Sequence, residues 1–199
     1  MAMTESTMMA LGTKAPAFAL KNTEGTMTSL SDFDNAKVLV VLFICNHCPY
    51  VIHIAPTLAD LAEQYKEQGV QFIAINSNDT DTYPADSFEN MVKEKALRGY
   101  SFPYLFDETQ AVAKAFDAAC TPDIFVFDQQ QKLAYRGQFD STRPTRISSG
   151  NYDSGKSPAT GEDLKAAIEG LLTGKTLSEN QVASIGCNIK WKAGNEPQY

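Results

Sequence analysis

The chain has 199 residues, of which 43% are hydrophobic and 21% are charged, as is typical of one globular domain with a buried core. Its formal net charge is −7 and it has no basic tract, so the composition argues against nucleic-acid binding, which requires clustered Lys and Arg. The longest strongly apolar run, residues 38–45, is too short to cross a membrane, and residues 1–11 carry no basic side chain, so we expect neither a membrane span nor a signal peptide.

Residues 38–44 are a continuous apolar run rich in β-branched side chains, which predicts a strand covered on both faces. Apolar residues at helical spacing follow between positions 58 and 65, and Gly69 ends that helix. Pro56 is expected to kink the helix or to mark its first turn. Residues 70–75 predict a second strand, and a right-handed β-α-β crossover would make the two strands parallel.

The middle of the chain carries further helix and strand signals. A second helix ends at Gly99, and Asp107 with Gln110 resembles a capping box for a third, short helix. Residues 124–127 and 132–136 are short apolar runs separated by a polar turn, which predicts a β-hairpin. The order of these elements predicts an α/β fold, with a central mixed β-sheet and helices on both faces.

Residues 143–157 are rich in Ser, Gly, Pro and Arg and predict a long loop. Residues 150–157 match the phosphate-binding loop pattern, but no buried strand precedes them and no helix follows directly, so we predict no nucleotide site there. Thr160 and Asp163 are predicted to cap a last helix, which Gly174 closes.

Cys45 and Cys48 form a Cys-x-x-Cys where the buried strand ends and the first helix begins. A helix N-terminus presents free amides and a dipole that favours a thiolate, and two cysteines at this spacing can close a disulfide. His47, if protonated or donating, would further stabilise a thiolate on Cys45 and make the disulfide more oxidising. With four cysteines and no export signal we expect a reducing compartment, where cysteines are structural, metal-binding or catalytic.

Thr121 and Pro122 stand directly before the strand predicted at 124–127. Together with the Cys-x-x-Cys, this pair resembles the thioredoxin superfamily. The resemblance implies that the Thr121-Pro122 bond is cis, whereas X-Pro bonds in general are cis only about 5–6% of the time. It also implies that Pro122 packs against the redox pair and positions the substrate backbone.

Two longer segments, residues 11–33 and the insertion at 84–99, extend the resemblance to the peroxiredoxin and thiol-specific-antioxidant branch, and shorter motifs lie at 45–51, 120–123 and 186–191. These motifs, with Cys-Asn-His-Cys at the redox position, resemble a group of peroxiredoxin-like thioredoxin-fold proteins. The resemblance implies a thioredoxin-like domain over residues 11–174, with an N-terminal β-hairpin and a helical insertion. The tail, residues 175–199, would pack on that domain.

The sequence also departs from both patterns. Cys48 followed by Pro49 matches a peroxidatic cysteine, but Cys45 stands where such enzymes carry Thr, and residues 119–122 lack their activating Arg. Leu39 stands where typical thioredoxins carry a buried proton-accepting Asp. Proton transfer would then depend on His47, Asp123, water or another group.

The remaining cysteines and histidines have simpler interpretations. Zinc normally takes four ligands, and only His47 and His53 lie near the cysteine pair in the sequence, so we predict no metal site. We assign no role to His53. Cys120 is predicted to be a small buried side chain, or alternatively a resolving thiol. Cys187 is predicted to pack near Trp191, or to act as a resolving cysteine after a large swing or in another subunit.

The leading hypothesis is a thiol–disulfide oxidoreductase. Cys45 would attack a disulfide and Cys48 would resolve the mixed disulfide, while His47 lowers the pKa of Cys45 and Thr121 and Pro122 hold the substrate. One alternative is a thiol peroxidase in which peroxide oxidises Cys48 to a sulfenic acid. A less favoured alternative is a non-catalytic or metal-carrying module with the same fold.

These hypotheses also define the expected partners. We expect protein or small-molecule disulfides or peroxides as substrates, a thiol as reductant, and no cofactor. We expect no nucleic-acid or membrane partner, a monomer or homodimer, and a cytoplasmic location.

Overall fold

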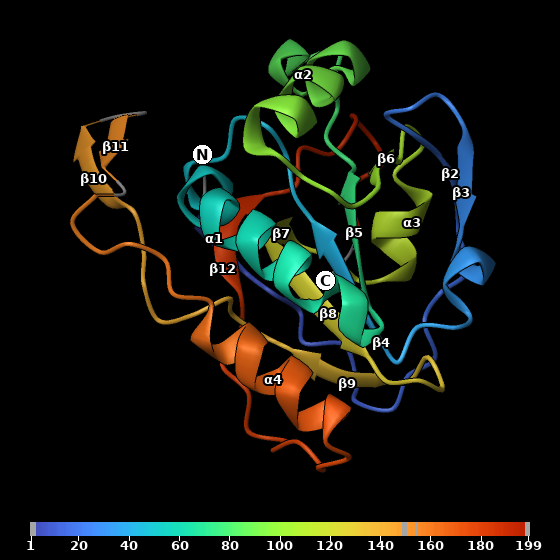
Figure 1. The fold of residues 1–199 in the computed structure, drawn as a ribbon. Coiled ribbons are helices and arrows are strands. Elements are labelled where there is room, and N and C mark those ends of the chain that lie inside the picture. Colours follow the sequence, from blue (N-terminus) through green and yellow to red (C-terminus); the bar gives the residue numbers. More distant parts are fainter. Residues whose placement is uncertain (1–2, 149–150, 154, 198–199) are drawn as a thin grey trace.

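A seven-stranded sheet of mixed direction runs through the middle of the molecule (Figure 1). In spatial order its strands are β3 (Met27–Ser29), β2 (Ala19–Asn22), β6 (Tyr104–Phe106), β5 (Val70–Asn76), β4 (Val38–Phe43), β8 (Asp123–Phe127) and β9 (Leu133–Arg136). β4, β5 and β6 are parallel neighbours, and the outer pairs are antiparallel. This computed structural model describes residues 3–148, 151–153 and 155–197. It confirms the β-α-β unit, the β8–β9 hairpin and the N-terminal hairpin of β2 and β3.

β4 is the centre of the core, because all six of its residues are buried. Alternate side chains of a strand point to opposite faces of its sheet. Val40 and Leu42 therefore pack in one apolar cluster, while Val41 and Phe43 pack in the other. The continuous apolar run in the sequence thus reflects a strand covered on both sides, as predicted.

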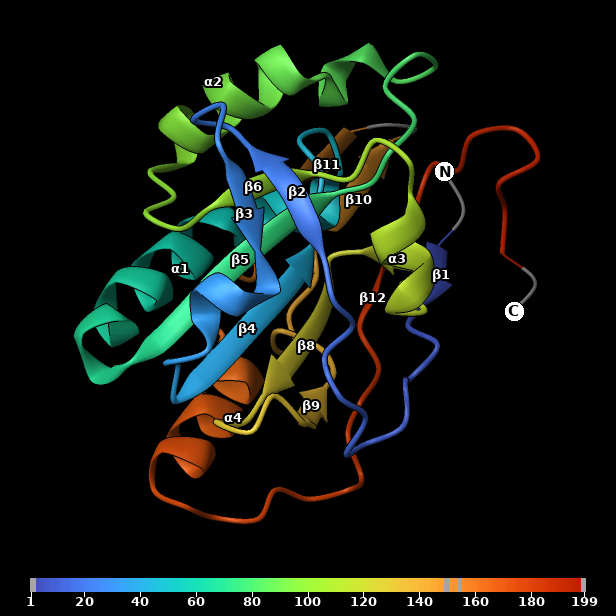
Figure 2. The ribbon, with the colours of Figure 1, turned by 90° about the vertical axis from the view of Figure 1, so that its right-hand side faces the viewer.

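Four α-helices are present in the described residues: α1 (Pro49–Tyr65), α2 (Phe88–Arg98), α3 (Ala111–Ala115) and α4 (Glu162–Leu172). α1 and α4 pack on one face of the sheet and α3 on the other (Figure 2). α1 begins seven residues before Pro56, so this proline lies inside the helix and not in its first turn. None of these helices combines the length and apolarity needed to cross a bilayer.

The described part of residues 143–157 is not the continuous loop that the sequence predicts, because it contains two strands. β10 (Thr145–Ser148) and β11 (Asn151–Asp153) form an antiparallel ribbon that extends away from the central sheet in Figure 1. The ribbon is largely exposed and lacks the apolar alternation by which strands are recognised. Its Ser-rich and Gly-rich sequence therefore predicts a loop instead of strands. Within the phosphate-loop pattern, residues 150 and 154 lie outside the described residues.

The two predicted capping arrangements are also different in the structure. Asp107 accepts hydrogen bonds from the Val112 and Ala113 amides of α3, but the Gln110 side chain donates to backbone carbonyls elsewhere and completes no capping box. At α4, Thr160 Oγ1 accepts from the Glu162 amide (3.4 Å), but Asp163 accepts from the Gln138 side chain, and the Asp140 carboxylate accepts from the Thr160 and Gly161 amides before the helix. The Asp107 cap is local, whereas the Asp140 contact joins residues about 20 positions apart, which local sequence patterns do not record.

The tail contributes a strand to a second, small sheet. β12 (Ile185–Asn188) lies between β1 (Met3–Glu5) and β7 (Cys120–Thr121) and is antiparallel to both. Just after β12, the Lys190 amide donates to Asn78 (2.8 Å) and the Lys190 carbonyl accepts from the Asp79 amide (2.7 Å). The tail is therefore fixed to the polar segment that follows β5.

Candidate redox-active site

The predicted cysteine pair lies in the turn between β4 and α1. β4 ends at Phe43, and Cys48 occupies the N-cap position of α1. Cys45 is 2% exposed and Cys48 is fully buried, and the two thiols are in hydrogen-bond contact. The chain folds this way because an apolar central strand and an amphipathic helix are joined by only a few residues, which brings both sulfurs into the core edge.

The Thr121-Pro122 bond is cis, as the resemblance implied, and Thr121 contacts both sulfurs. The Cys48 thiol donates to the Thr121 carbonyl at 3.1 Å, and Cys45 Sγ lies 3.6 Å from Thr121 Oγ1. The two predicted motifs, 73 residues apart in the sequence, therefore meet at one buried cluster.

Within the pair the pKa of Cys48 is lowered and that of Cys45 is raised, whereas the sequence predicts a thiolate on Cys45. Burial raises the pKa of Cys45, and its contacts with Cys48 and the charge of Asp86 raise it further. Burial also raises the pKa of Cys48, but hydrogen bonds from Cys187, Cys45, Thr121 and the first turn of α1 outweigh it and hold that pKa well below its usual value. α1 begins only after Cys48, so the amides and dipole of the helix favour a thiolate on Cys48 and not on Cys45.

A ring nitrogen of His47 lies within 4.8 Å of both Cys45 Sγ and a carboxylate oxygen of Asp86. Its Nδ1 lies 2.7 Å from Oδ2 of Asp86, which is fully buried. The hydrogen bond and the charge of Asp86 raise the pKa of His47 against the opposing effect of burial, and the charge of Cys48 also raises it. A protonated His47 is thus stabilised, and its charge favours the thiolate form of Cys48 electrostatically.

Asp86 is the site residue that sequence reasoning missed. It lies in a short 3-10 helix, Pro84–Asp86, and its carboxylate accepts from the Asn46 amide (2.8 Å) and from Asn78 Nδ2 (2.8 Å) as well as facing His47. It therefore fixes both residues between the cysteines. The signal available in the sequence was the unusually polar segment that directly follows a buried strand, residues 76–86.

A metal could meet three donor groups at this site. Cys45, His47 and Asp86 each offer one ligand atom, and these atoms lie within 4.8 Å of one another. Both Asp86 oxygens already accept hydrogen bonds, so an ion would have to replace part of that network. The hydrogen bonds account for the arrangement of the three side chains without a metal.

The two remaining cysteines lie close to the pair. Cys187, on β12, is directly opposite Thr121 in the strand register, and its side chain is in hydrogen-bond contact with Cys48. No large swing is needed to bring it to the pair, which corrects that part of the prediction. Cys120 is fully buried, and its Sγ faces the carbonyl oxygens of Pro122 (3.5 Å) and Ser184 (3.9 Å). Burial raises the pKa of Cys120, consistent with the predicted small buried side chain.

The other predicted groups lie at the margin of the site. Asp123 is fully buried in β8, and burial raises its pKa to about 6 despite a hydrogen bond from the Ala119 amide. Asp123 directly follows Pro122, and its negative charge raises the pKa of Cys120. His53, to which no role was assigned, is buried and bonded to Thr142 through Nε2.

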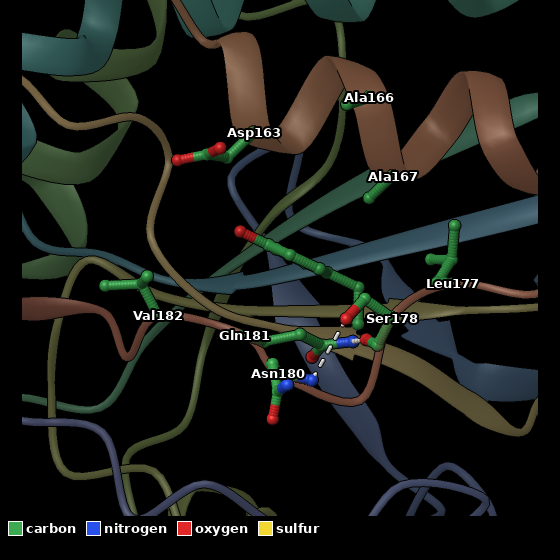
Figure 3. Close-up of a pocket in the computed structure, with 9 residues that line it drawn as sticks. Asp163, Ala166, Ala167, Leu177, Ser178, Asn180, Gln181 and Val182 are labelled. Atoms are coloured by element: carbon green, nitrogen blue, oxygen red, sulfur yellow. Dashed lines mark hydrogen bonds between the residues drawn. The ribbon is translucent and has the colours of Figure 1, made fainter.

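Two cavities differ in their relation to this cluster. Figure 3 shows one of about 210 Å³, which lies between α4 and residues 177–182, and none of its nine lining residues is a cysteine. A second cavity, of about 220 Å³, is lined by Cys187 together with Tyr50, Arg146 and Tyr152. The second cavity therefore leads to a sulfur of the cluster, whereas the first does not.

Comparison with known proteins agrees with this geometry. The chain is 27% identical over 140 residues to a protein named thiol-disulfide oxidoreductase ResA from Bacillus thuringiensis subsp. konkukian, covering 70% of this chain and 76% of that one. It is 50% identical to an uncharacterized conserved protein from Geobacillus kaustophilus, whose crystal structure matches 96% of this chain and 97% of its own with a TM-score of 0.88.

The fold has more distant relatives as well. The crystal structure of a putative thiol:disulfide interchange protein DsbE from Chlorobium tepidum is 24% identical, with a TM-score of 0.62, and covers 82% of this chain and 98% of its own. That likeness establishes the thioredoxin-like fold. The family model described as Redoxin matches residues 10–153, well over half of the chain. The chain therefore belongs to the Redoxin family.

Proposed function

We propose that this protein is a thiol–disulfide oxidoreductase that works through the Cys45–Cys48 dithiol. The observation that carries the proposal is the contact of both sulfurs with each other and with Thr121 beside the cis Pro122. The name of the curated relative, thiol-disulfide oxidoreductase, supports the same reaction class.

The protonation of the pair favours Cys48 as the attacking sulfur, because the thiolate is the reactive form. The Cys48 thiolate attacks a substrate disulfide, forms a mixed disulfide and releases the first substrate thiolate. Cys45 then loses its proton, attacks Cys48 Sγ and releases the second substrate thiolate, which takes up that proton. The substrate is reduced, the protein gains a Cys45–Cys48 disulfide, and an external thiol must reduce it again.

Each surrounding residue has a place in this proposal. His47 supports the Cys48 thiolate by charge, and Asp86 positions His47 and the turn. Thr121 holds both sulfurs, and Pro122 shapes the surface at which the substrate disulfide arrives.

The test is the reduction of a glutathione-mixed disulfide or of insulin by the reduced protein. Cys48→Ser should lower the rate at least about 100-fold, while Cys120→Ala, the matched buried cysteine, should stay within about twofold. Exchange by Cys48→Ser at the wild-type rate would contradict the proposal. If Cys45→Ser rather than Cys48→Ser abolishes formation of the first mixed disulfide, the order of attack is the one predicted from sequence.

A thiol peroxidase is a second candidate, because Cys48 combines a lowered pKa with the N-cap position before Pro49. Peroxide would oxidise the Cys48 thiolate to a sulfenic acid, and Cys45 would condense with it and release water. The reduced protein should then consume peroxide orders of magnitude faster than free cysteine, and dimedone should label Cys48. A rate close to that of the free thiol would leave only the disulfide-exchange function.

We also propose a cytoplasmic location and a monomeric or homodimeric state. Cell fractionation and light scattering on the purified chain test the two statements directly.

A further inference from the structure

Cys187 is placed against the redox pair by strand pairing. β12 runs antiparallel to β7, and this register sets Cys187 opposite Thr121, the residue that contacts both Cys45 and Cys48. Cys187 is 3% exposed and belongs to the same buried apolar cluster as the two cysteines. Its thiol is in hydrogen-bond contact with that of Cys48, which also contacts Cys45.

The backbone around Cys187 leaves little freedom for another position. A Cβ atom added to Gly186 would lie 2.0 Å from the Thr121 carbonyl oxygen, so β12 lies directly on the residue before the cis-proline bond. Further along the tail, the hydrogen bonds of Lys190 to Asn78 and Asp79 hold the segment in place. The contact of Cys187 with Cys48 is therefore built into the fold.

We propose that Cys187 is a third redox-active thiol, which exchanges with the Cys45–Cys48 disulfide to give a Cys48–Cys187 disulfide. The inference rests on the proposed function, because that function supplies the first disulfide. Deprotonated Cys187 attacks Cys48 Sγ, the Cys45–Cys48 bond breaks, and Cys45 leaves with the electron pair. The proton lost by Cys187 passes to Cys45, so the exchange needs no external oxidant or reductant.

The cavity beside Cys187 offers a site at which a reductant could reach this thiol. Its walls include Cys187, Arg146 and the rings of Tyr50 and Tyr152, whose centroids are 6.3 Å apart. A small thiol with a carboxylate fits this combination of apolar walls and one cation. Its thiolate would attack Cys187 Sγ, and Cys48 would leave as the thiolate that its surroundings stabilise. A second molecule of the thiol would then attack the mixed disulfide, releasing the Cys187 thiolate and the disulfide of the small thiol. The reductant would thus enter at Cys187 while the substrate is handled at Cys45 and Cys48.

Trypsin separates the cysteines in a way that makes the disulfides readable. Cys45 and Cys48 share the peptide 38–66, Cys120 lies in 115–132, and Cys187 lies in 176–190. The experiment treats folded Cys45→Ser protein with diamide, quenches with acid, alkylates the free thiols and maps the peptides by mass spectrometry. Diamide is used because it oxidises thiols whether or not the proposed function is correct.

The expected product is peptide 38–66 joined to 176–190, at least about tenfold above the same peptide joined to 115–132. Cys45→Ser/Cys120→Ala should give the same product, and Cys45→Ser/Cys187→Ser should give none. If Cys48 of Cys45→Ser remains a free thiol, or joins Cys120 instead, the inference is wrong.

A second measurement uses the wild-type chain. Oxidised wild-type protein should be an equilibrium mixture of molecules with a Cys45–Cys48 disulfide and molecules with a Cys48–Cys187 disulfide. The Cys187→Ser substitution should slow reduction of the oxidised protein by glutathione at least about tenfold, whereas Cys120→Ala should leave that rate unchanged. Equal reduction rates in wild type and Cys187→Ser would overturn the entry of the reductant at Cys187. Failure of wild-type protein to reduce glutathione-mixed disulfides, with Cys48–Cys187 still formed by diamide, would overturn the proposed function alone.

Discussion

The two histidines of the chain experience opposite environments. The hydrogen bond and charge of Asp86 raise the pKa of His47, whereas burial lowers that of His53. We predict two histidine transitions in an NMR titration, one above and one below the ordinary value of about 6.5. Asp86→Asn should lower the pKa of His47 and leave that of His53 unchanged; an unmoved His47 would exclude the ion pair.

The His47–Asp86 pair also makes the free energy of unfolding depend on pH. A histidine whose pKa is raised on folding stabilises the fold fully below its unfolded pKa, and that contribution is lost as the pH rises through the folded pKa. The loss of unfolding free energy in Asp86→Asn should therefore be larger near pH 6 than near pH 8. Urea denaturation at both values measures it, and equal losses would assign the role of Asp86 to its amide contacts alone.

Asp123 is predicted to oppose folding at neutral pH. Its pKa rises to about 6 in the fold, from 3.8, because it is fully buried. The native state then holds its proton more tightly, so stability falls as the pH rises from about 4 to about 6.5, by about 3 kcal/mol in total. Asp123→Asn should remove that fall from the pH profile of chemical denaturation. Parallel profiles for the two proteins would contradict the prediction.

At the scale of elements, β12 depends on a residue without a side chain. In Gly186→Ala the new methyl group would meet the Thr121 carbonyl, which is backbone and cannot rotate away. We predict a loss of about 1–3 kcal/mol in unfolding free energy. Gly155→Ala is the control, because its Cβ would meet only a movable Asp153 side chain, and it should change stability by about 0.5 kcal/mol or less. Similar effects at the two positions would show that β12 packs more loosely than described.

The elements that the sequence predicts well are those with a strong periodic pattern. β4, β5 and α1 carry continuous or helical apolar repeats, and their connection places Cys45 and Cys48 at a helix start without further information. β7 and β12 have two and four residues, which is too short for a repeat to emerge. Their pairing depends on chain segments far apart, so local patterns contain no trace of it.

The site residues also fall into those that the sequence predicts and those that only the tertiary structure identifies. The pairing of the cysteines with Thr121 and Pro122 follows from motifs, whereas the roles of Asp86 and Cys187 follow from tertiary packing. The assignment of the thiolate needed one local detail, the residue at which α1 begins. Because α1 begins at Pro49, the free amides of its N-terminus lie nearer in the chain to Cys48 than to Cys45.

For the whole molecule, the redox state should control how stability depends on pH. The pKa of Cys48 is lowered on folding, so its thiolate stabilises the reduced protein above the ordinary thiol pKa, and this contribution is lost as the pH falls through the folded pKa. The raised pKa values of Cys45 and Cys187 leave those thiols protonated near neutrality in both states, so they do not oppose the trend there. Relative to protein that lacks this thiolate, reduced protein should therefore gain stability as the pH rises toward the ordinary thiol pKa, by up to about 1.4 kcal/mol for each unit of pH.

The measurement compares denaturation of reduced and disulfide-bonded protein over that rise in pH. Oxidised wild type and reduced Cys48→Ser both lack the thiolate, and both should lack the gain. If the free energy of unfolding of reduced wild type changes with pH in the same way as in these two controls, the pKa of Cys48 is not lowered.

The strand β12, which carries Cys187, also sets an order of events during synthesis. It is translated about 140 residues after Cys48. At roughly 5–20 residues per second, the ribosome needs on the order of 10–30 s to supply it. During that interval the nascent chain holds Cys45 and Cys48 without the strand that later covers them. The newly made dithiol therefore meets the thiols and oxidants of its surroundings before the finished protein can restrict access to it.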